Sequence, residues 1–198
     1  MRIFIGIDLD PEVRSRISRF LEGVCGFAPE ARWVSPDSLH ITLKFVGEQT
    51  EEQVEAIFER LRLIEWDAFE IRCAGYGFFP TAKAARVFWI GIHAGASLGK
   101  LAGEVDVAVA ELGVGREERP YSPHLTLARG GGRSGSPGRI KGEVANTTFA
   151  VLQKRLAAMG KLDFGAMMAN EFILYQSQLS PGGSKYTRLQ RFSKRQIV

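Results

Sequence analysis

The stretch SLHITLKFVGE, residues 38–48, decides the fold, because its centre returns later in the chain as SPHLTLAR, residues 122–129. Both copies have the form His-apolar-Thr-Leu, and together they hold two of the three histidines of the chain. The alternation of polar and apolar residues predicts a β-strand in each copy. Side chains at i and i+2 share one face of a strand, so each copy presents an imidazole beside a threonine hydroxyl and turns its apolar residues toward a core. If the two strands face each other, two imidazoles and two hydroxyls converge on one cleft.

The rest of the chain alternates between strand-like and helix-like patterns. Asp10 before Pro11, and Thr50 before Gln53, are typical of helix N-termini. Strands are predicted at 2–9, 31–35, 39–46, 69–77, 86–92, 124–128, 171–179 and 184–192, the last two forming a hairpin across LSPGGS. Helices are predicted after Asp10, after Thr50, over 97–112 and over 143–158. The mixture predicts an α+β fold class with two antiparallel β-sheets and flanking helices, arranged as one bilobal domain over 1–198.

Composition narrows the class of protein. A hydrophobic content of 45% with 24% charged residues in 198 residues is that of a soluble globular protein and excludes a disordered chain. The net charge of +4 is compatible with an anionic ligand but is weak evidence for nucleic acid. Cys25 and Cys73 match no zinc spacing and are predicted to be reduced thiols. The N-terminus has no signal-peptide pattern and no apolar run is long enough to span a bilayer, so we expect a cytoplasmic protein without membrane attachment.

The repeated residues suit chemistry at phosphorus. Two histidines can divide an in-line displacement, because one takes a proton from the nucleophile while the other gives a proton to the leaving oxygen. Threonine hydroxyls can donate to phosphoryl oxygens, and Arg129 can add a bidentate contact. The motifs contain no extra carboxylate or thiolate ligands, so no metal is expected. The candidate catalytic residues are His40, Thr42, His124 and Thr126.

A single His-x-Thr on a strand usually has a structural role. The presence of a second copy favours a functional role for both. A hydrophobic repeat explains the apolar positions, but it does not select His and Thr at both polar positions. The third histidine, His93, ends a predicted strand without a matching threonine and is expected to be solvated or to cap the strand.

HITL at 40–43 and HLTL at 124–127 resemble the paired HxTx signatures of the 2H phosphoesterases. The segments RIFIGIDLDPEVR, RWVSPDSLHITLKFVGE, PYSPHLTLAR and LYQSQLSPGGSKYTRL resemble the RNA 2′,3′-cyclic phosphodiesterases, first described as 2′–5′ RNA ligases, from the first strand to the last. The resemblance implies two lobes related by pseudo-twofold symmetry, with the HxTx motifs on facing central strands. It implies hydrolysis of a 2′,3′-cyclic phosphate at an RNA or nucleotide end to a 2′-phosphate, by a monomer without a cofactor. The RNA partner is expected to include tRNA fragments or cyclic nucleotides.

The resemblance also assigns roles. His40 resembles the general acid that protonates the departing 3′ oxygen and His124 the general base that activates water, although near-symmetric motifs leave the two roles exchangeable. Thr42 and Thr126 would hold the phosphate oxygens, with help from Arg129.

Three neighbouring residues have two interpretations each. Phe45 falls where the family offers an aromatic ring to the terminal base, or it is a core residue in alternation with Leu43. Tyr186 matches a recurrent tyrosine near the cleft, or it packs the closing hairpin. Lys44 faces solvent or the RNA backbone.

The motifs are also compatible with two other activities, and one segment has two interpretations. The same acid and base would serve ATP-independent 2′–5′ ligation to a 5′-hydroxyl, or the cleft would bind an RNA end without turning it over. The glycine-rich stretch 130–142, with Arg133 and Arg139, is either a lid over RNA or a tolerated insertion.

Overall fold

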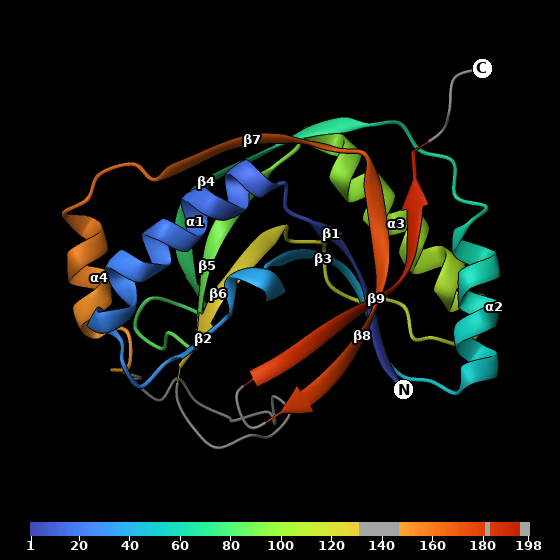
Figure 1. Cartoon of the computed structure of the whole chain (residues 1–198), viewed down its shortest axis with the longest axis horizontal. Coiled ribbons are helices and arrows are strands. Elements are labelled where there is room, and N and C mark those ends of the chain that lie inside the picture. The colour runs from blue at the N-terminus through green and yellow to red at the C-terminus, as the bar shows by residue number, and fades with distance from the viewer. Residues whose placement is uncertain (131–146, 181–182, 195–198) are drawn as a thin grey trace.

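The computed structural model of the chain describes residues 1–130, 147–180 and 183–194, which form two antiparallel β-sheets with four α-helices around them (Figure 1). The predicted α+β class is confirmed. The first sheet has the order β3 (His40–Glu48), β1 (Arg2–Asp8), β8 (Glu171–Ser180) and β9 (Gly183–Ser193). The second has the order β2 (Arg32–Trp33), β6 (His124–Arg129), β5 (Val87–His93), β4 (Phe69–Phe79) and β7 (Asp163–Ala169).

The helices begin where their capping residues predict. Helix α1 (Pro11–Val24) starts after Asp10, whose carboxylate accepts a hydrogen bond from the Val13 amide over 2.9 Å. Helix α2 (Glu51–Leu61) starts after Thr50 with the predicted reciprocal capping box to Gln53. Helices α3 (Gly95–Ala110) and α4 (Ala150–Ala157) follow, together with the short 3₁₀ turns η1 (Cys25–Phe27) and η2 (Pro36–Ser38).

Two elements of the structure differ from the prediction. The helix expected over 143–158 begins only at Ala150, after a turn, and residues 143–146 lie outside the described part of the chain. Strand β7 was not predicted, because DFGAMMA is rich in small residues and Met and carries no β-branched residue. The expectations for the glycine-rich stretch and its two arginines concern residues that, apart from Gly130, also lie outside the described ranges.

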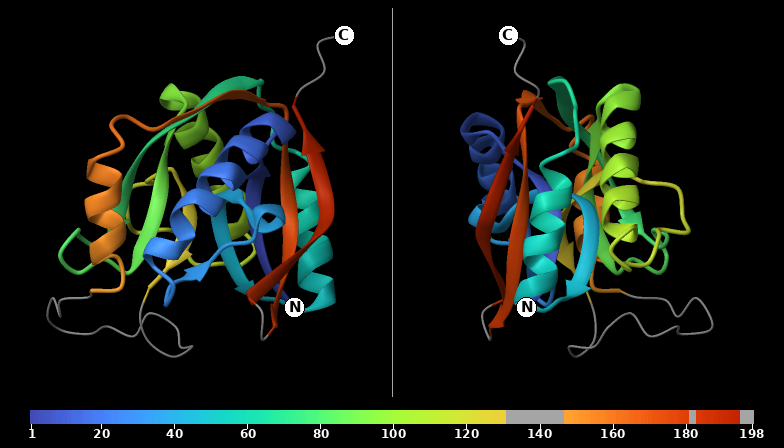
Figure 2. Two further views of the ribbon diagram at one scale, coloured as in Figure 1. Left: turned by 60° about the vertical axis from the view of Figure 1, so that its left-hand side comes forward. Right: turned by 90° about the vertical axis from the view of Figure 1, so that its right-hand side faces the viewer.

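The two sheets repeat one topology. The order β3-β1-β8-β9 matches β6-β5-β4-β7 strand for strand, and every one of these neighbours is antiparallel. Helix α1, which follows β1, packs against β7 of the second sheet. Helix α3, which joins β5 to β6, packs against β3 of the first sheet and lies beside α2 (Figure 2). Each sheet is therefore covered in part by a helix that follows a strand of the other.

A continuous apolar core joins the two sheets. The apolar residues of the two motifs, Ile41 and Leu43 in β3 and Leu125 and Leu127 in β6, are at most 5% exposed and belong to the same cluster. Burial of each such side chain stabilises the fold by about 1.5–3 kcal/mol. The predicted inward direction of these residues is confirmed, and the residues between them are left on the opposite face.

The expectation of central strands needs correction. Strand β3 is the edge strand of its sheet, and β6 has only the two-residue β2 on its outer side. The inner position next to β3 is taken by β1, which has a long apolar run and pairs on both sides. Strands β3 and β6 nevertheless contact each other, because the edges of the two sheets meet in the middle of the molecule.

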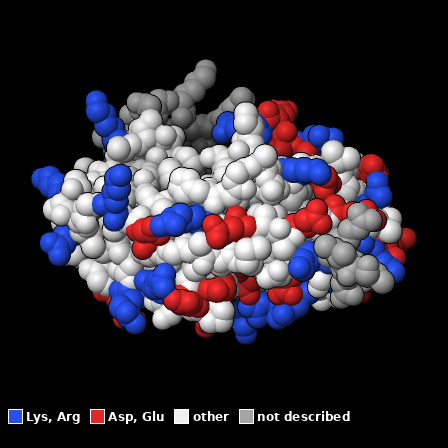
Figure 3. All heavy atoms as spheres, turned by 90° about the horizontal axis from the view of Figure 1, so that it is seen from above, with Lys and Arg blue, Asp and Glu red and all other residues white. Residues whose placement is uncertain are grey.

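Surface features add two observations. On the face shown in Figure 3, basic and acidic side chains are interspersed, so the net positive charge is not gathered into one patch there. In the described ranges, no helix is both long and apolar enough to cross a membrane.

Candidate active site where the two sheets meet

The two motif histidines are held in the same way. His40 Nδ1 lies 2.8 Å from the carbonyl oxygen of Ser38, and His124 Nδ1 lies 2.8 Å from the carbonyl oxygen of Ser122. A carbonyl oxygen only accepts hydrogen bonds, so Nδ1 carries the hydrogen in both neutral rings. Each ring is left with Nε2 as the nitrogen that can exchange a proton with a ligand.

Burial sets the protonation state of both rings. It lowers the pKa of His40 to about 4, against smaller raising effects of the Ser38 carbonyl and the Asp8 carboxylate. Burial also lowers the pKa of His124, although the Ser122 carbonyl raises it. The charge of Arg129 lowers the pKa of both histidines. One guanidinium thus acts on both imidazoles, and both are neutral at pH 7.

The threonines accompany the histidines on both strands. Thr42 and Thr126 are half-buried, as are the two motif histidines beside them. Tyr121, just before β6, donates its hydroxyl to the Thr42 carbonyl oxygen over 2.8 Å. This hydrogen bond holds the segment that leads into β6 against β3, so it links the two strands that carry the motifs.

A bulge in β3 decides the directions of the residues after Thr42. Opposite β1, the pairing moves from Gly6–Thr42 to Ile5–Lys44, which leaves Leu43 as an extra residue. Beyond it the alternation is inverted, so that Lys44 is buried and Phe45 is 64% exposed. The expectation that Lys44 faces solvent or RNA is therefore wrong, and so is the core interpretation of Phe45.

Phe45 instead belongs to the surroundings of His40. Its ring centroid is 6.2 Å from that of Phe4, and the Phe4 ring is 4.6 Å from the His40 imidazole. Gly6 permits the close approach of β1 to β3 beside these rings, because a Cβ there would lie 2.8 Å from the Ile41 carbonyl oxygen and 3.5 Å from His40 Cδ2. An exposed ring beside the histidine is therefore available to a flat ligand group.

Lys44 anchors β3 to α3 and to the loop that follows it. Its ammonium donates to Asp106 Oδ1 over 2.6 Å and to the Gly115 carbonyl over 2.7 Å. Asp106, on α3, also accepts from the Glu117 amide and pairs with Arg116. The buried ion pair joins β3 to α3 and to the loop that leads to the second motif.

The position of Tyr186 is compatible with both of its interpretations. Its ring meets the His40 imidazole edge-on at 5.0 Å and the Phe4 ring at 4.9 Å, so it borders the site and also packs the β8–β9 hairpin. Arg129 ends β6, and burial of its guanidinium lowers its pKa, against a smaller raising effect of the nearby Tyr186 phenol. Arg129 thus lies within electrostatic range of three other predicted residues, His40, His124 and Tyr186.

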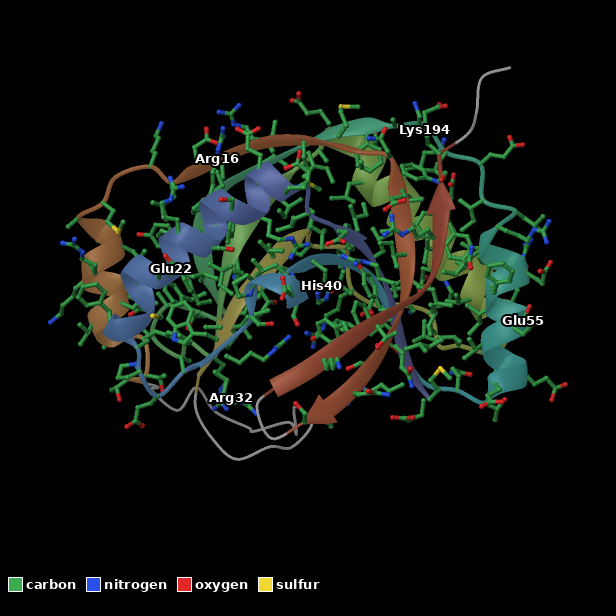
Figure 4. The ribbon with its side chains drawn as sticks, in the orientation of Figure 1. Arg16, Glu22, Arg32, His40, Glu55 and Lys194 are labelled. Atoms are coloured by element: carbon green, nitrogen blue, oxygen red, sulfur yellow. The ribbon has the colours of Figure 1, made fainter. Side chains whose placement is uncertain are left out.

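A pocket of about 410 Å³ opens beside His40 and holds residues that were not predicted. Its charged centre is Asp8, which accepts hydrogen bonds from Arg14 and from Arg188. In Figure 4, His40 lies near the middle of the molecule, beside the β8–β9 hairpin that forms one wall. The sequence did contain a signal for Asp8, Arg14 and Arg188, because all three lie in the segments that resemble the RNA 2′,3′-cyclic phosphodiesterases. The lining residues are Asp8, Arg14, Asp37, Ser38, Leu39, His40, Tyr175, Tyr186, Thr187 and Arg188.

The remaining histidine lies outside this arrangement. His93 is exposed at the end of β5, with Nε2 3.1 Å from the Ala74 carbonyl oxygen, as expected for a solvated residue that caps a strand. In the ranges that the structure describes, no group of three or more His, Cys, Asp or Glu side chains is placed to hold a metal ion.

Comparison with known proteins places this geometry in context. Residues 7–89 match the model of the LigT like Phosphoesterase family. A protein of Methanothermobacter thermautotrophicus named RNA 2′,3′-cyclic phosphodiesterase is 31% identical over 194 residues, which cover 97% of this chain and 98% of the relative. A protein of the same name from Archaeoglobus fulgidus is 33% identical, covering 97% of this chain and 99% of the relative.

Solved structures agree over the whole fold. Escherichia coli LigT complexed with 3′-AMP has a TM-score of 0.74 at 27% identity, with 98% of both chains covered. A protein of Thermus thermophilus has a TM-score of 0.74 at 29% identity, with 98% of this chain and 97% of that chain covered.

Proposed function

Because this chain belongs to the LigT-like phosphoesterase family, we propose that it hydrolyses 2′,3′-cyclic phosphate ends of RNA to 2′-phosphates without a metal ion. One observation carries the proposal: two imidazoles, each held at Nδ1 by the carbonyl two residues before it, lie under the influence of the same guanidinium. Two titrating groups at one site suit acid–base catalysis, whereas binding alone needs neither.

In this proposal each histidine has one task. His124 takes a proton from water at Nε2, and the water oxygen attacks phosphorus in line with the 3′ oxygen. The P–O3′ bond breaks as His40 donates a proton to that oxygen, leaving a 2′-phosphate and a 3′-hydroxyl. Thr42 and Thr126 donate to the phosphoryl oxygens, and Arg129 balances the charge that grows on them.

The surroundings of His40 support its assignment as the acid. Asp8 raises the pKa of His40, whereas none of the carboxylates in the described ranges raises that of His124 in this way. Burial outweighs Asp8 and holds the pKa of His40 at about 4. A bound phosphodiester adds a second negative charge, which favours the protonated ring. Substrate binding and protonation of His40 are therefore coupled.

Phe45 and Tyr186 complete the substrate site. The exposed Phe45 ring suits stacking on the terminal base, which tolerates most bases. We propose that the chain acts as one bilobal domain, which the core that spans both sheets supports, and that it acts as a monomer.

The test is an assay in EDTA with a short RNA that ends in a 2′,3′-cyclic phosphate. Wild type is expected to yield a 2′-phosphate, while His40→Ala and His124→Ala each lower kcat by about 100-fold or more. His93→Ala is the matched control, since His93 is exposed and lies outside the site.

Three outcomes would contradict the proposal. Tight RNA binding without turnover by wild type would indicate a binding module. Turnover that disappears with EDTA would contradict metal independence. Preferential formation of 2′–5′ linkages, when a 5′-hydroxyl RNA is supplied, would assign the same acid and base to ligation.

A further inference from the structure

The pocket beside His40 contains an exposed guanidinium group, that of Arg188, which also bonds to Tyr175. The guanidinium groups of Arg14 and Arg188 share one carboxylate, that of Asp8. The side chain of Arg14 is 18% exposed and is also held by the Pro36 carbonyl, but that of Arg188 is 47% exposed. Arg188 therefore keeps donors that a ligand in the pocket can use.

The pocket and Phe45 lie on different sides of His40. Along β1, Phe4 pairs with Phe45 and Asp8 pairs with His40, four residues further on. At about 3.3 Å per residue these positions are roughly 13 Å apart. The imidazole lies between the two, since it contacts Phe4 and also lines the pocket.

The connectivity of a nucleotide fits this order. In a ribose 2′,3′-cyclic phosphate, C1′ next to C2′ carries the base, and C4′ next to C3′ carries the chain to the preceding nucleotide. With the base on Phe45 and the 3′ oxygen at His40, the 5′ chain is directed beyond His40, toward Asp8 and Arg188.

We propose that this pocket binds the nucleotide preceding the cyclic end, with Arg188 on the phosphodiester that joins the two. The inference rests on the proposed function and narrows its substrate class to RNA ends of at least two nucleotides. Tyr186 forms an aromatic wall for the preceding nucleoside. The exposed carboxylate of Asp37 also lines the pocket and offers an acceptor for a ribose hydroxyl.

The experiment compares a dinucleotide and a mononucleotide, each with a 2′,3′-cyclic phosphate. For wild type, kcat/KM is expected to be higher for the dinucleotide. Arg188→Gln is expected to lower the ratio of the two kcat/KM values about tenfold, the effect of one charged hydrogen bond. Arg191→Gln is the matched control, because Arg191 lies on the same strand, pairs with Glu171 and does not line the pocket.

A second substrate separates binding from structure. In a dinucleotide whose internal linkage is a neutral methylphosphonate, wild type is expected to lose the same factor, and Arg188→Gln to add no further loss. Equal losses on the mononucleotide and the dinucleotide would show that Arg188 only supports Asp8 and would overturn the subsite. Equal kcat/KM of wild type for both substrates would also overturn it while leaving the proposed function intact. Absence of turnover on either substrate would refute the function itself.

Discussion

Replacement of Lys44 by Met tests the buried ion pair that joins the two motifs. The methionine keeps the length and apolar stem of lysine but removes the ammonium. Asp106, whose side chain is 11% exposed, would lose its partner at 2.6 Å, and the Gly115 carbonyl would lose its donor. The variant isolates the charge, since the packing volume is nearly conserved.

The magnitude follows from what remains around the carboxylate. Loss of one partner of a buried pair costs about 3–5 kcal/mol. Arg116 still pairs with Asp106 at 2.7 Å, and the Glu117 amide still donates to it, so we expect the lower end, about 3 kcal/mol of unfolding free energy. Arg116→Gln is the control on the same carboxylate. The Arg116 side chain is 61% exposed, and its loss is expected to cost about 1 kcal/mol or less.

Equilibrium unfolding in urea measures both variants. With a slope of about 2 kcal/mol/M, Lys44→Met is expected to lower the midpoint by about 1.5 M and Arg116→Gln by less than about 0.5 M. A Lys44→Met midpoint within about 0.5 M of wild type, at unchanged slope, would refute the reasoning. Equal shifts in the two variants would also refute it, because exposure would then not govern the strength of the pairs.

The other predictions concern the site itself. Because burial lowers the pKa of both imidazoles below 6.5, kcat/KM is expected to be bell-shaped with its maximum on the acid side of pH 6.5, and a rate that is flat from about pH 5 to 8 would exclude two-histidine catalysis. The pKa of His40 is about 4 when folded and about 6.5 when unfolded, so stability is lost as the pH falls from about 6.5 to about 4, and urea titrations should show a smaller loss for His40→Gln than for wild type. Phe45→Ala is expected to raise KM about tenfold and to leave the melting temperature unchanged, because the ring is 64% exposed, and an unchanged KM would remove Phe45 from the base site. Tyr121→Phe removes the hydrogen bond to the Thr42 carbonyl and is expected to cost about 1 kcal/mol, with kcat lowered more than KM is raised; a change in KM alone would place Tyr121 in binding.

Local signals predicted much of this fold. The caps at Asp10 and Thr50 depend on residues three positions away, and the structure has both. The inward positions of the two motifs depend only on alternation over four residues, and they too are confirmed. Such features need no knowledge of distant strands, which is why the sequence contains enough information for them.

The bulge after Thr42 shows where local reasoning ends. Alternation from His40 predicts that Lys44 shares the face of His40 and that Phe45 is internal. The extra residue in β3 arises from pairing with β1, whose backbone approaches closely at Gly6, and it reverses both directions. The residue type at position 44 did not indicate burial either, because a lysine in a strand is usually exposed.

Other differences have the same origin in distant contacts. Strand β7 owes its existence to pairing with β4, about ninety residues earlier, and not to strand propensity. The pocket charges of Asp8, Arg14 and Arg188 come from β1, α1 and β9, so no spacing in the sequence brings them together. These charges are grouped only in the folded chain, where β1 pairs with β8 and β8 pairs with β9.

The strand order of the first sheet has a consequence for synthesis of the chain. Residues 3–6 of β1 pair with residues 173–176 of β8, which are translated about 170 residues later. At about 5–20 residues per second, a ribosome needs roughly ten seconds or more to reach β8 after β1 has been made. During this interval one edge of β1 has no partner within its sheet. We expect nascent chains that lack β8 and β9 to be protease-sensitive and to become protected abruptly once both strands have been added, as pairing between distant segments dominates the rate.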